Sequence, residues 1–204
     1  MSRLLGLYQQ RLQTHPKSTN ALMTGFLFGT GDIIAQTFFP ENPKSKYDYA
    51  RTARGIIYGS CIFSFIGSKW YTFLSKINLP QTSSSPLINK TKNAVARMAV
   101  DQLMFSPVGI PLYFSVMSIM EGQSFQDLKS KLEQNWWSTL KVNWMVWPAF
   151  QLFNLGFVPV QHQLLVVNGV SILWNTFLSL RNAKKEEQGK QDEKMPVHYP
   201  PVPE

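Results

Sequence analysis

Apolar residues in this chain gather into long stretches separated by short polar connections, and this pattern predicts helices that cross a membrane. The first stretch covers residues 20–39 and ends at Pro40. About 20 residues is the length needed to cross the hydrocarbon core of a bilayer. The later apolar stretches cover residues 52–75, 93–120, 140–158 and 160–180. The pattern fits five spans, or about four spans with one broken or re-entrant segment.

Two segments predict helices that lie on the membrane surface. Residues 1–19 are basic and amphipathic, with Tyr8 and Leu12 on one face, and no acidic residue precedes Asp32. Such a start is typical of a mitochondrial targeting segment and equally of a surface helix. In residues 121–140 the apolar positions also share one helical face, opposite the charges: Phe125, Leu128, Leu132, Trp136 and Leu140.

The expected fold is an all-α, multi-pass transmembrane helical bundle with kinked or broken helices. Pro107, Pro148 and Pro159 lie in or beside the predicted spans, where proline removes a backbone donor and bends or ends a helix. The bundle covers residues 20–181. It follows the basic segment 1–19 and precedes a charged, proline-rich tail, residues 182–204, which is predicted to be flexible.

Polar and small residues line one face of the first predicted span. Gly25, Gly29, Asp32 and Gln36 fall on a single helical stripe. Small residues let another helix approach closely, and Gly55 and Gly59 form a similar pair in the second span, where Trp70 and Tyr71 suit a membrane interface. An aspartate at mid-helix costs about 2.5–3.5 kcal/mol on insertion scales, so Asp32 is expected to face protein or water.

Amides are gathered in the same way near the C-terminal end. Trp144, Trp147, Gln151 and Asn154 share one helical face, and Asn168 and Asn175 are seven residues apart on the next helix. In the third span Asp101 and Gln102 are adjacent, and Arg97 precedes Asp101 by four residues, a spacing that permits an ion pair. The pattern predicts a polar seam inside an apolar bundle.

A polar seam has two interpretations, which the sequence leaves open. Its side chains either hold helices together through hydrogen bonds or line a water-filled path. The candidates for a pore lining are Asp32, Gln36, Asp101, Gln102, Gln151, Asn154, Asn168 and Asn175. The candidates that would shape or gate the path are Trp144, Trp174, Pro107, Pro148 and Pro159.

Composition and charge narrow the class of protein. Charged residues make up 16% of the chain, against roughly 25% in soluble domains. The formal net charge of +8 comes from cations at the ends of apolar stretches, as in membrane helices, and not from a basic stripe for nucleic acid. Cys61 is the one cysteine, and the three histidines lack metal-ligand spacing. We therefore expect no enzyme activity, no cofactor, no metal and no nucleic-acid partner.

The chain resembles a known family over about residues 5–180. The matching residues near the C-terminus are Trp144, Trp147, Pro148, Gln151, Asn154, Val158, Pro159, Asn168, Trp174, Asn175, Leu178 and Ser179. The earlier ones are Tyr8, Leu12, Pro16, Thr19, Gly31, Asp32, Gln36, "RTAR" from Arg51, Trp70, Tyr71, Asp101, Gln102 and Pro107. Together they resemble the Mpv-seventeen / peroxisomal-membrane-protein-twenty-two family, and "YDYARTARGIIYGSCIFSFIGSKWY" is similar to its fungal mitochondrial branch. Gln163 departs from the family pattern, which usually has arginine there.

The resemblance implies a small multi-pass protein of the mitochondrial inner membrane or the peroxisomal membrane. It also implies channel-like passage of small solutes and links to stress response and mitochondrial DNA maintenance. We expect a mitochondrial inner-membrane channel or transporter for small metabolites in contact with the lipid bilayer, as a homo-oligomer or in a larger membrane complex. The alternative is a non-conducting scaffold or assembly factor. With four spans both termini share the matrix side, and a fifth span moves the C-terminus across.

Overall fold

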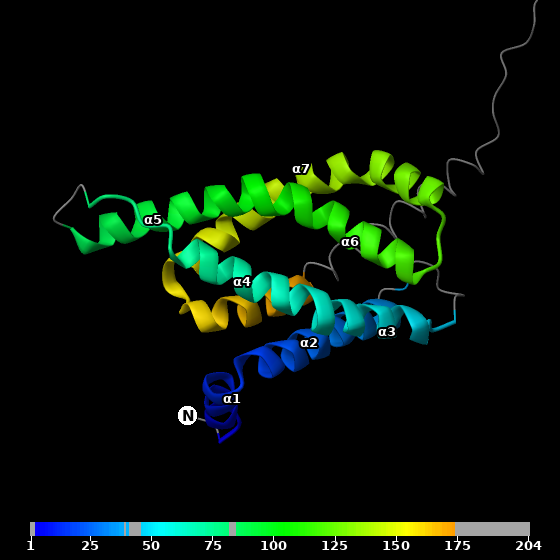
Figure 1. The fold of residues 1–204 in the computed structure, drawn as a ribbon, viewed down its shortest axis with the longest axis horizontal. Helices are drawn as coiled ribbons and strands as arrows, with labels where there is room; N and C mark the ends of the chain where they lie inside the picture. Colours follow the sequence, from blue (N-terminus) through cyan, green and yellow to red (C-terminus); the bar gives the residue numbers. More distant parts are fainter. Residues whose placement is uncertain (1–2, 39, 41–45, 82–84, 174–204) are drawn as a thin grey trace, which may run out of the picture.

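The computed structural model describes residues 3–38, 40, 46–81 and 85–173, and every regular element within these ranges is a helix (Figure 1). The expected all-α fold is therefore confirmed. The elements are α1 (Arg3–Thr14), α2 (Pro16–Phe38), α3 (Tyr49–Ile57), η1 (Tyr58–Phe63), α4 (Ser64–Ser75), α5 (Pro86–Val100), η2 (Asp101–Phe105), α6 (Ser106–Met120) and α7 (Phe125–Phe157), followed by the helix Val160–Leu173. Trp174, Asn175 and the tail at 182–204 lie outside the described residues.

Two π-helical segments, η1 and η2, join α-helices into longer rods. Residues 49–75 form one rod through η1, and residues 86–120 form another through η2. Pro107 was expected to kink or break the third span; it sits just after η2, and the helix continues through it without a break. The wider turn, in which the N–H of Ser106 bonds the carbonyl of Asp101, ends directly before the proline and gives its ring room.

The expected surface helix at 121–140 and the span at 140–158 are one helix, α7, and this corrects the sequence prediction. Its start is fixed by a capping box in which Ser124 and Asp127 each bond the other's backbone N–H. Pro148 lies inside α7 without ending it. Pro159 does end it, because Val158 adopts the extended backbone, φ −84° and ψ 131°, that the residue before a proline prefers.

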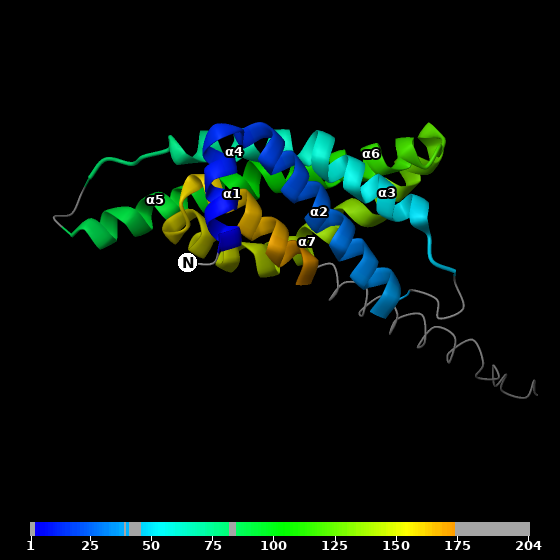
Figure 2. The same ribbon diagram turned by 90° about the horizontal axis from the view of Figure 1, so that it is seen from below.

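Most of the helices run roughly along the long axis of the molecule and pack side by side, whereas α1 stands across that axis (Figures 1 and 2). α2 packs against α3, η1 and α4, whereas α7 packs against α5 and α6. A core cluster joins these two groups to the helix Val160–Leu173 and consists of Tyr71, Leu74, Leu155, Leu164 and Val167.

The helix Val160–Leu173 turns back from the end of α7 and runs alongside α2. Its Asn168 bonds Thr24, and its Ile172 lies beside Gly31. The described chain therefore ends away from α1 (Figure 2).

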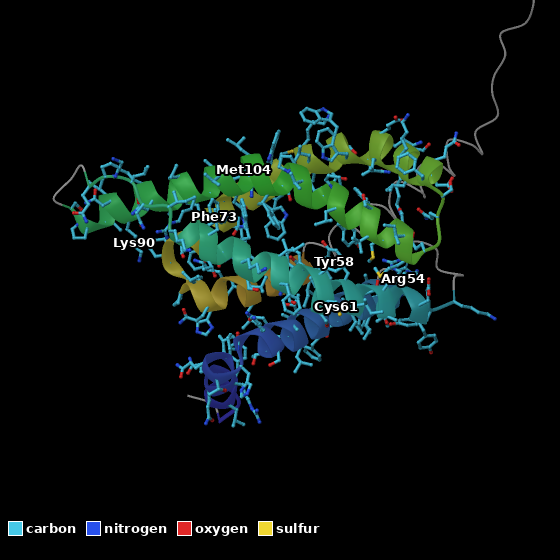
Figure 3. The ribbon with its side chains drawn as sticks, viewed as in Figure 1. Arg54, Tyr58, Cys61, Phe73, Lys90 and Met104 are labelled. Atoms are coloured by element: carbon cyan, nitrogen blue, oxygen red, sulfur yellow. The ribbon has the colours of Figure 1, made fainter. Side chains whose placement is uncertain are left out.

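Much of the apolar surface points outward. Among the described residues, Pro86–Met120 is the helix both long and apolar enough to cross a membrane, with a mean hydropathy of 1.6 in its best window. Only 11% of that window is buried, whereas a core helix of a soluble protein would be mostly covered. Met104 is 57% exposed and lies on the outer side of this helix (Figure 3). The helix Val160–Leu173 is apolar but shorter.

Candidate functional site

The candidate site is centred on Asp101, the first residue of η2, which is only 2% exposed. The indole N–H of Trp70 donates to Oδ1 of Asp101 at 2.7 Å. The side-chain amides of Gln102 and Gln151 each donate to Oδ2 at 2.8 Å. Three helical segments, α4, η2 and α7, therefore converge on one buried carboxyl group.

Arg97 does not pair with Asp101, contrary to what its spacing permits. Its guanidinium donates to the carbonyls of Ser75 and Ile77, at 3.2 and 3.0 Å, and to Oδ1 of Asn78 at 2.9 Å. The last carbonyls of a helix lack intrahelical donors and attract cations, so Arg97 caps the end of α4. Asp101 is consequently held by neutral donors alone among the described residues.

The hydrogen bonds around Asp101 extend into a larger network. Gln151 also donates to the hydroxyl of Tyr71 at 3.1 Å. Asn143 donates to the side-chain oxygens of Gln102 and Ser106, both at 3.1 Å. The indole of Trp144 donates to the backbone carbonyl of Gln102 at 2.9 Å. Four sequence candidates, Asp101, Gln102, Gln151 and Trp144, thus meet in one place.

Trp70 and Tyr71 contact this network directly, whereas the sequence reading placed them at a membrane interface. Tyr71 is 5% exposed and belongs to the core cluster. A signal for this position was present in the sequence, because small residues precede Tyr71 on the same helical face. The buried face of α4 is formed by Ser64, Gly67, Tyr71 and Leu74.

Asn154 and Gln163 hold the turn at Pro159. Nδ2 of Asn154 donates to Oε1 of Gln151 at 3.2 Å and to the carbonyl of Gln163 at 3.4 Å. Nε2 of Gln163 donates to the carbonyl of Val158 at 3.0 Å, which satisfies an acceptor at the end of α7. Gln163, the residue that departs from the family pattern, therefore closes the turn between two helices.

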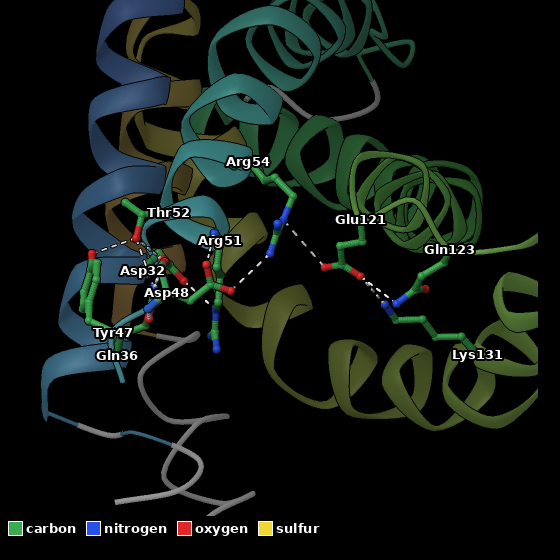
Figure 4. Close-up of polar contacts among 10 residues, drawn as sticks. All are labelled: Asp32, Gln36, Tyr47, Asp48, Arg51, Thr52, Arg54, Glu121, Gln123 and Lys131. Atoms are coloured by element: carbon green, nitrogen blue, oxygen red, sulfur yellow. Dashed lines mark hydrogen bonds and ion pairs between the residues drawn. The ribbon is translucent and has the colours of Figure 1, made fainter. Parts of the chain in front are cut away.

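Asp32 and Gln36 form a separate group at the other end of the bundle (Figure 4). Asp32 makes an ion pair with Arg51 at 2.8 Å and accepts hydrogen bonds from Thr52 at 2.6 Å and Gln36 at 2.7 Å. Oε1 of Gln36 accepts from the backbone N–H of Asp48 at 2.7 Å. These contacts tie α2 to the start of α3, and Asp32 faces protein, one of the two surroundings expected for it.

Asp48 caps the start of α3 within this group. The backbone N–H of Arg51 donates to Oδ1 of Asp48 at 2.9 Å, and Arg54 approaches Oδ2 at 3.4 Å. The hydrogen bond from Arg51 is the main reason why the pKa of Asp48 lies below its ordinary value, and the positive charge of Arg54 adds to it. The carboxylate is therefore favoured at the beginning of the helix.

The remaining candidates lie between these two groups or outside the described residues. Asn168 is 2% exposed and donates to the hydroxyl of Thr24 at 2.9 Å, joining the return helix to α2. The predicted seam is thus resolved into three buried or half-buried groups. Trp174 and Asn175 lie outside the described residues.

Glycines allow α2 to approach the α3–η1 rod closely. A Cβ on Gly25 would overlap Oγ of Ser60, and one on Gly29 would lie 2.7 Å from Cγ1 of Ile56. A Cβ on Gly59 would lie 3.0 Å from the ring of Phe28. Gly55 differs, because a Cβ there would meet nothing within 4 Å. Close contact between these helices therefore depends most on Gly25 and Gly29.

Comparison with known proteins gives the chain its family. The profile of the Mpv17 / PMP22 family matches residues 118–179. Protein SYM1 of Saccharomyces cerevisiae is 55% identical over 207 residues, covering 99% of this chain and 100% of the relative. Protein SYM1 of Kluyveromyces lactis is 50% identical over 204 residues, covering both chains completely. No solved structure showed significant similarity. The chain therefore belongs to the Mpv17/PMP22 family and is a membrane protein of that family.

Proposed function

We propose that this protein is a multi-pass channel or transporter for small polar metabolites in the mitochondrial inner membrane, and not an enzyme. The observation that carries the proposal is the buried carboxyl group of Asp101, which has three neutral donors and no cation partner among the described residues. An ionisable group within a membrane-spanning helix is costly and characteristically serves ions, protons or polar solutes.

Helix dimensions support several crossings of the bilayer. Residues 49–75 and 125–157 form rods of about 40–50 Å at 1.5 Å per residue, long enough for a hydrocarbon core of about 30 Å. Their polar side chains lower their hydropathy, but Gln151 and Asn154 are 4% and 0% exposed. Polar residues that face inward are compatible with lipid on the outer surface.

Three buried amide oxygens support passage of a polar solute. Oδ1 of Asn154, Oε1 of Gln163 and Oδ1 of Asn168 accept no hydrogen bond from the described residues. Unsatisfied buried acceptors call for an explanation, and a polar solute or water passing along the helices would supply the missing donors. Asp101 would favour cations or proton donors near the same route, and Trp144 would restrict it.

The mitochondrial location rests on the N-terminal segment and on kinship. Residues 1–19 are basic and contain no acid, as mitochondrial targeting segments do. The stress response and mitochondrial DNA maintenance that the family resemblance implies belong to this proposal as its physiological setting.

A non-conducting scaffold or assembly factor is the second candidate, and one observation favours it. The carboxyl group of Asp101 already has hydrogen-bond donors within the protein, because Gln102, Gln151 and Trp70 all donate to it. Holding helices together is a sufficient role for such a network, in which each hydrogen bond contributes about 0.6–2 kcal/mol. Outward apolar side chains would then also bind partner proteins.

Solute flux separates the two candidates. The purified full chain would be inserted into liposomes and tested for passage of small charged and neutral metabolites. The wild type is expected to exceed empty liposomes, and Asp101→Asn to change the rate or cation preference by about tenfold. Glu133→Gln, which removes an exposed carboxylate from α7, is the matched control and is expected to behave as wild type. Flux no higher than in empty liposomes, with insertion verified, would reject the channel and leave the scaffold.

A further inference from the structure

A basic groove lies between the start of α2 and the second half of α4, away from the Asp101 network. It encloses about 410 Å³ and is lined by Pro16, Lys17, Asn20, Ser68, Lys69, Thr72, Phe73 and Lys76. Neither the polar network nor the family comparison assigns it a role. We propose that this groove binds the headgroup of an anionic membrane phospholipid.

Three lysines give the groove its charge. Lys17 comes from α2, Lys69 comes from α4, and Lys76 is the C-cap residue directly after α4. No carboxylate among the described residues pairs with any of their ammonium groups, whereas Lys131 pairs with Glu121 at 3.4 Å at the far end of the bundle. The three lysines therefore make the groove positively charged, and an anion bound in it would be attracted by that charge.

Among the residues that the structure describes, the helix segments around the groove carry no acidic residue. No Asp or Glu occurs before Asp32, between Asp48 and Asp101, or from residue 134 to residue 173. The cations of α1, the start of α2, α4 with its C-cap residue, and α5 are Arg3, Arg11, Lys17, Lys69, Lys76, Lys90, Lys92 and Arg97. At the opposite end Asp32, Asp48 and Glu121 are each paired with a cation (Figure 4). The positive potential is therefore concentrated where the groove lies.

Neutral groups in the groove suit a phosphate ester. Lys17 and Asn20 lie in the first turns of α2, a 23-residue helix whose N-terminus carries partial positive charge. Asn20, Ser68 and Thr72 bring amide and hydroxyl groups to the same wall. Phosphate oxygens accept hydrogen bonds from amide N–H, hydroxyl and ammonium groups alike.

Phe73 decides between a lipid and a soluble anion as the ligand. Its ring lines the groove and is 47% exposed, and the residue lies on α4 (Figure 3). A soluble phosphate gains nothing from an exposed aromatic ring, whereas an acyl chain leaving the headgroup would cover it. Basic pockets between membrane helices, close to a helix end, bind the headgroups of anionic lipids. The inference holds whether the protein conducts or acts as a scaffold.

Lipid binding by the purified full chain in non-ionic detergent tests the proposal. Short-chain phosphatidylglycerol would be titrated while thermal unfolding is followed, with phosphatidylcholine, inorganic phosphate and poly-glutamate as comparison ligands. We expect saturable binding of phosphatidylglycerol and no comparable binding of the other three. Replacing the three lysines, as Lys17→Gln, Lys69→Gln and Lys76→Gln together, is expected to weaken it on the order of a hundredfold, from about fivefold for each lysine.

The matched control removes three cations from the same end but outside the groove: Arg11→Gln, Lys90→Gln and Lys92→Gln. It is expected to retain most of the affinity, because the groove and not the general field holds the headgroup. Equal loss in both triple variants would overturn the proposal, as would binding of inorganic phosphate or poly-glutamate with the affinity of the lipid. If the groove variant does not fold, Lys69→Gln alone replaces it, with an expected loss of about fivefold. An unchanged affinity in that variant would also overturn the proposal.

Discussion

The side-chain amide of Gln151 on α7 donates a hydrogen bond of 2.8 Å to the carboxyl group of Asp101 in η2, between residues 50 positions apart in the chain. The indole of Trp70 on α4 reaches the other oxygen of the same group. Asp101 thus joins three helices that are far apart in sequence. A bond of this kind, inside a low-dielectric bundle, is expected to contribute to both stability and any solute selectivity.

Replacing Trp70 by phenylalanine tests how much this junction stabilises the fold. Trp70→Phe keeps an aromatic ring but removes the N–H that donates to Asp101 at 2.7 Å. We expect the free energy of unfolding in detergent to fall by about 1.5–3 kcal/mol, the range for a hydrogen bond to a charged group. Trp137→Phe is the control, because the ring of Trp137 is 52% exposed. Equal losses in the two variants would show that the N–H of Trp70 is not important.

The burial of this network was predictable in part from the sequence. Gln151 and Asn154 recur with the period of a helix beside Trp144 and Trp147, and the structure buries both amides. Asp32 was likewise expected to face protein or water and not lipid. Local periodicity carries this information because it fixes which side chains share a face.

The partners across helices were not predictable in the same way. The spacing of Arg97 and Asp101 permits an ion pair, yet Arg97 binds the carbonyls of Ser75 and Ile77. Which helix end lies beside Arg97 depends on tertiary packing that a spacing rule does not contain. Pro148 gives a similar lesson, because its local preference to interrupt a helix is overridden within α7.

Gly25 lies where α2 and η1 approach closely, so replacing it by alanine is expected to destabilise the fold. Gly25→Ala is expected to lower the free energy of unfolding by about 1–3 kcal/mol, because the new methyl group overlaps Oγ of Ser60 and would lie 3.3 Å from the backbone carbonyl of Ile56, so that the Ser60 side chain must turn and the tight contact must relax. Gly55→Ala on the facing rod is the control, since a Cβ there meets nothing within 4 Å. That control is expected to gain about 0.5–1 kcal/mol from reduced backbone freedom. Unfolding in detergent measures both, and equal effects of the two substitutions would contradict the close approach.

The start of α7 is expected to depend on pH. Oδ2 of Asp127 accepts two hydrogen bonds from Ser124, one from its hydroxyl at 2.6 Å and one from its backbone N–H at 3.1 Å. These two bonds lower the pKa of Asp127 below the ordinary value of about 3.9. Because the pKa of Asp127 is lower in the folded protein than in the unfolded chain, the cap stabilises the fold fully at pH values above the unfolded-state pKa. This stabilisation is lost as the pH falls through the folded-state pKa.

Thermal unfolding at about pH 6 and about pH 3 measures this contribution. The wild type is expected to lose more stability on acidification than Asp127→Asn, which has no carboxylate to protonate. Glu133→Gln removes a different exposed carboxylate of α7 and is expected to retain the wild-type response. A response of Asp127→Asn as large as that of the wild type would refute the role of this cap.

The ion pair between Asp32 and Arg51 gives a prediction that bears on whether Asp32 lines a path or joins helices. The two charged groups are 2.8 Å apart, with side chains 14% and 41% exposed respectively. A double-mutant cycle of Asp32→Asn and Arg51→Gln is expected to show a coupling energy of about 1 kcal/mol, limited by the exposure of Arg51. The same cycle on Lys129 and Glu133, an exposed pair at 3.9 Å, should give a coupling energy of only a few tenths of a kcal/mol.

Solute flux then separates the two roles of Asp32. If Asp32 only joins α2 to α3, Asp32→Asn will change the free energy of unfolding but leave solute flux per folded protein unchanged. If it also lines the path, flux or ion preference will change as well, because the substitution removes a negative charge from the wall of that path.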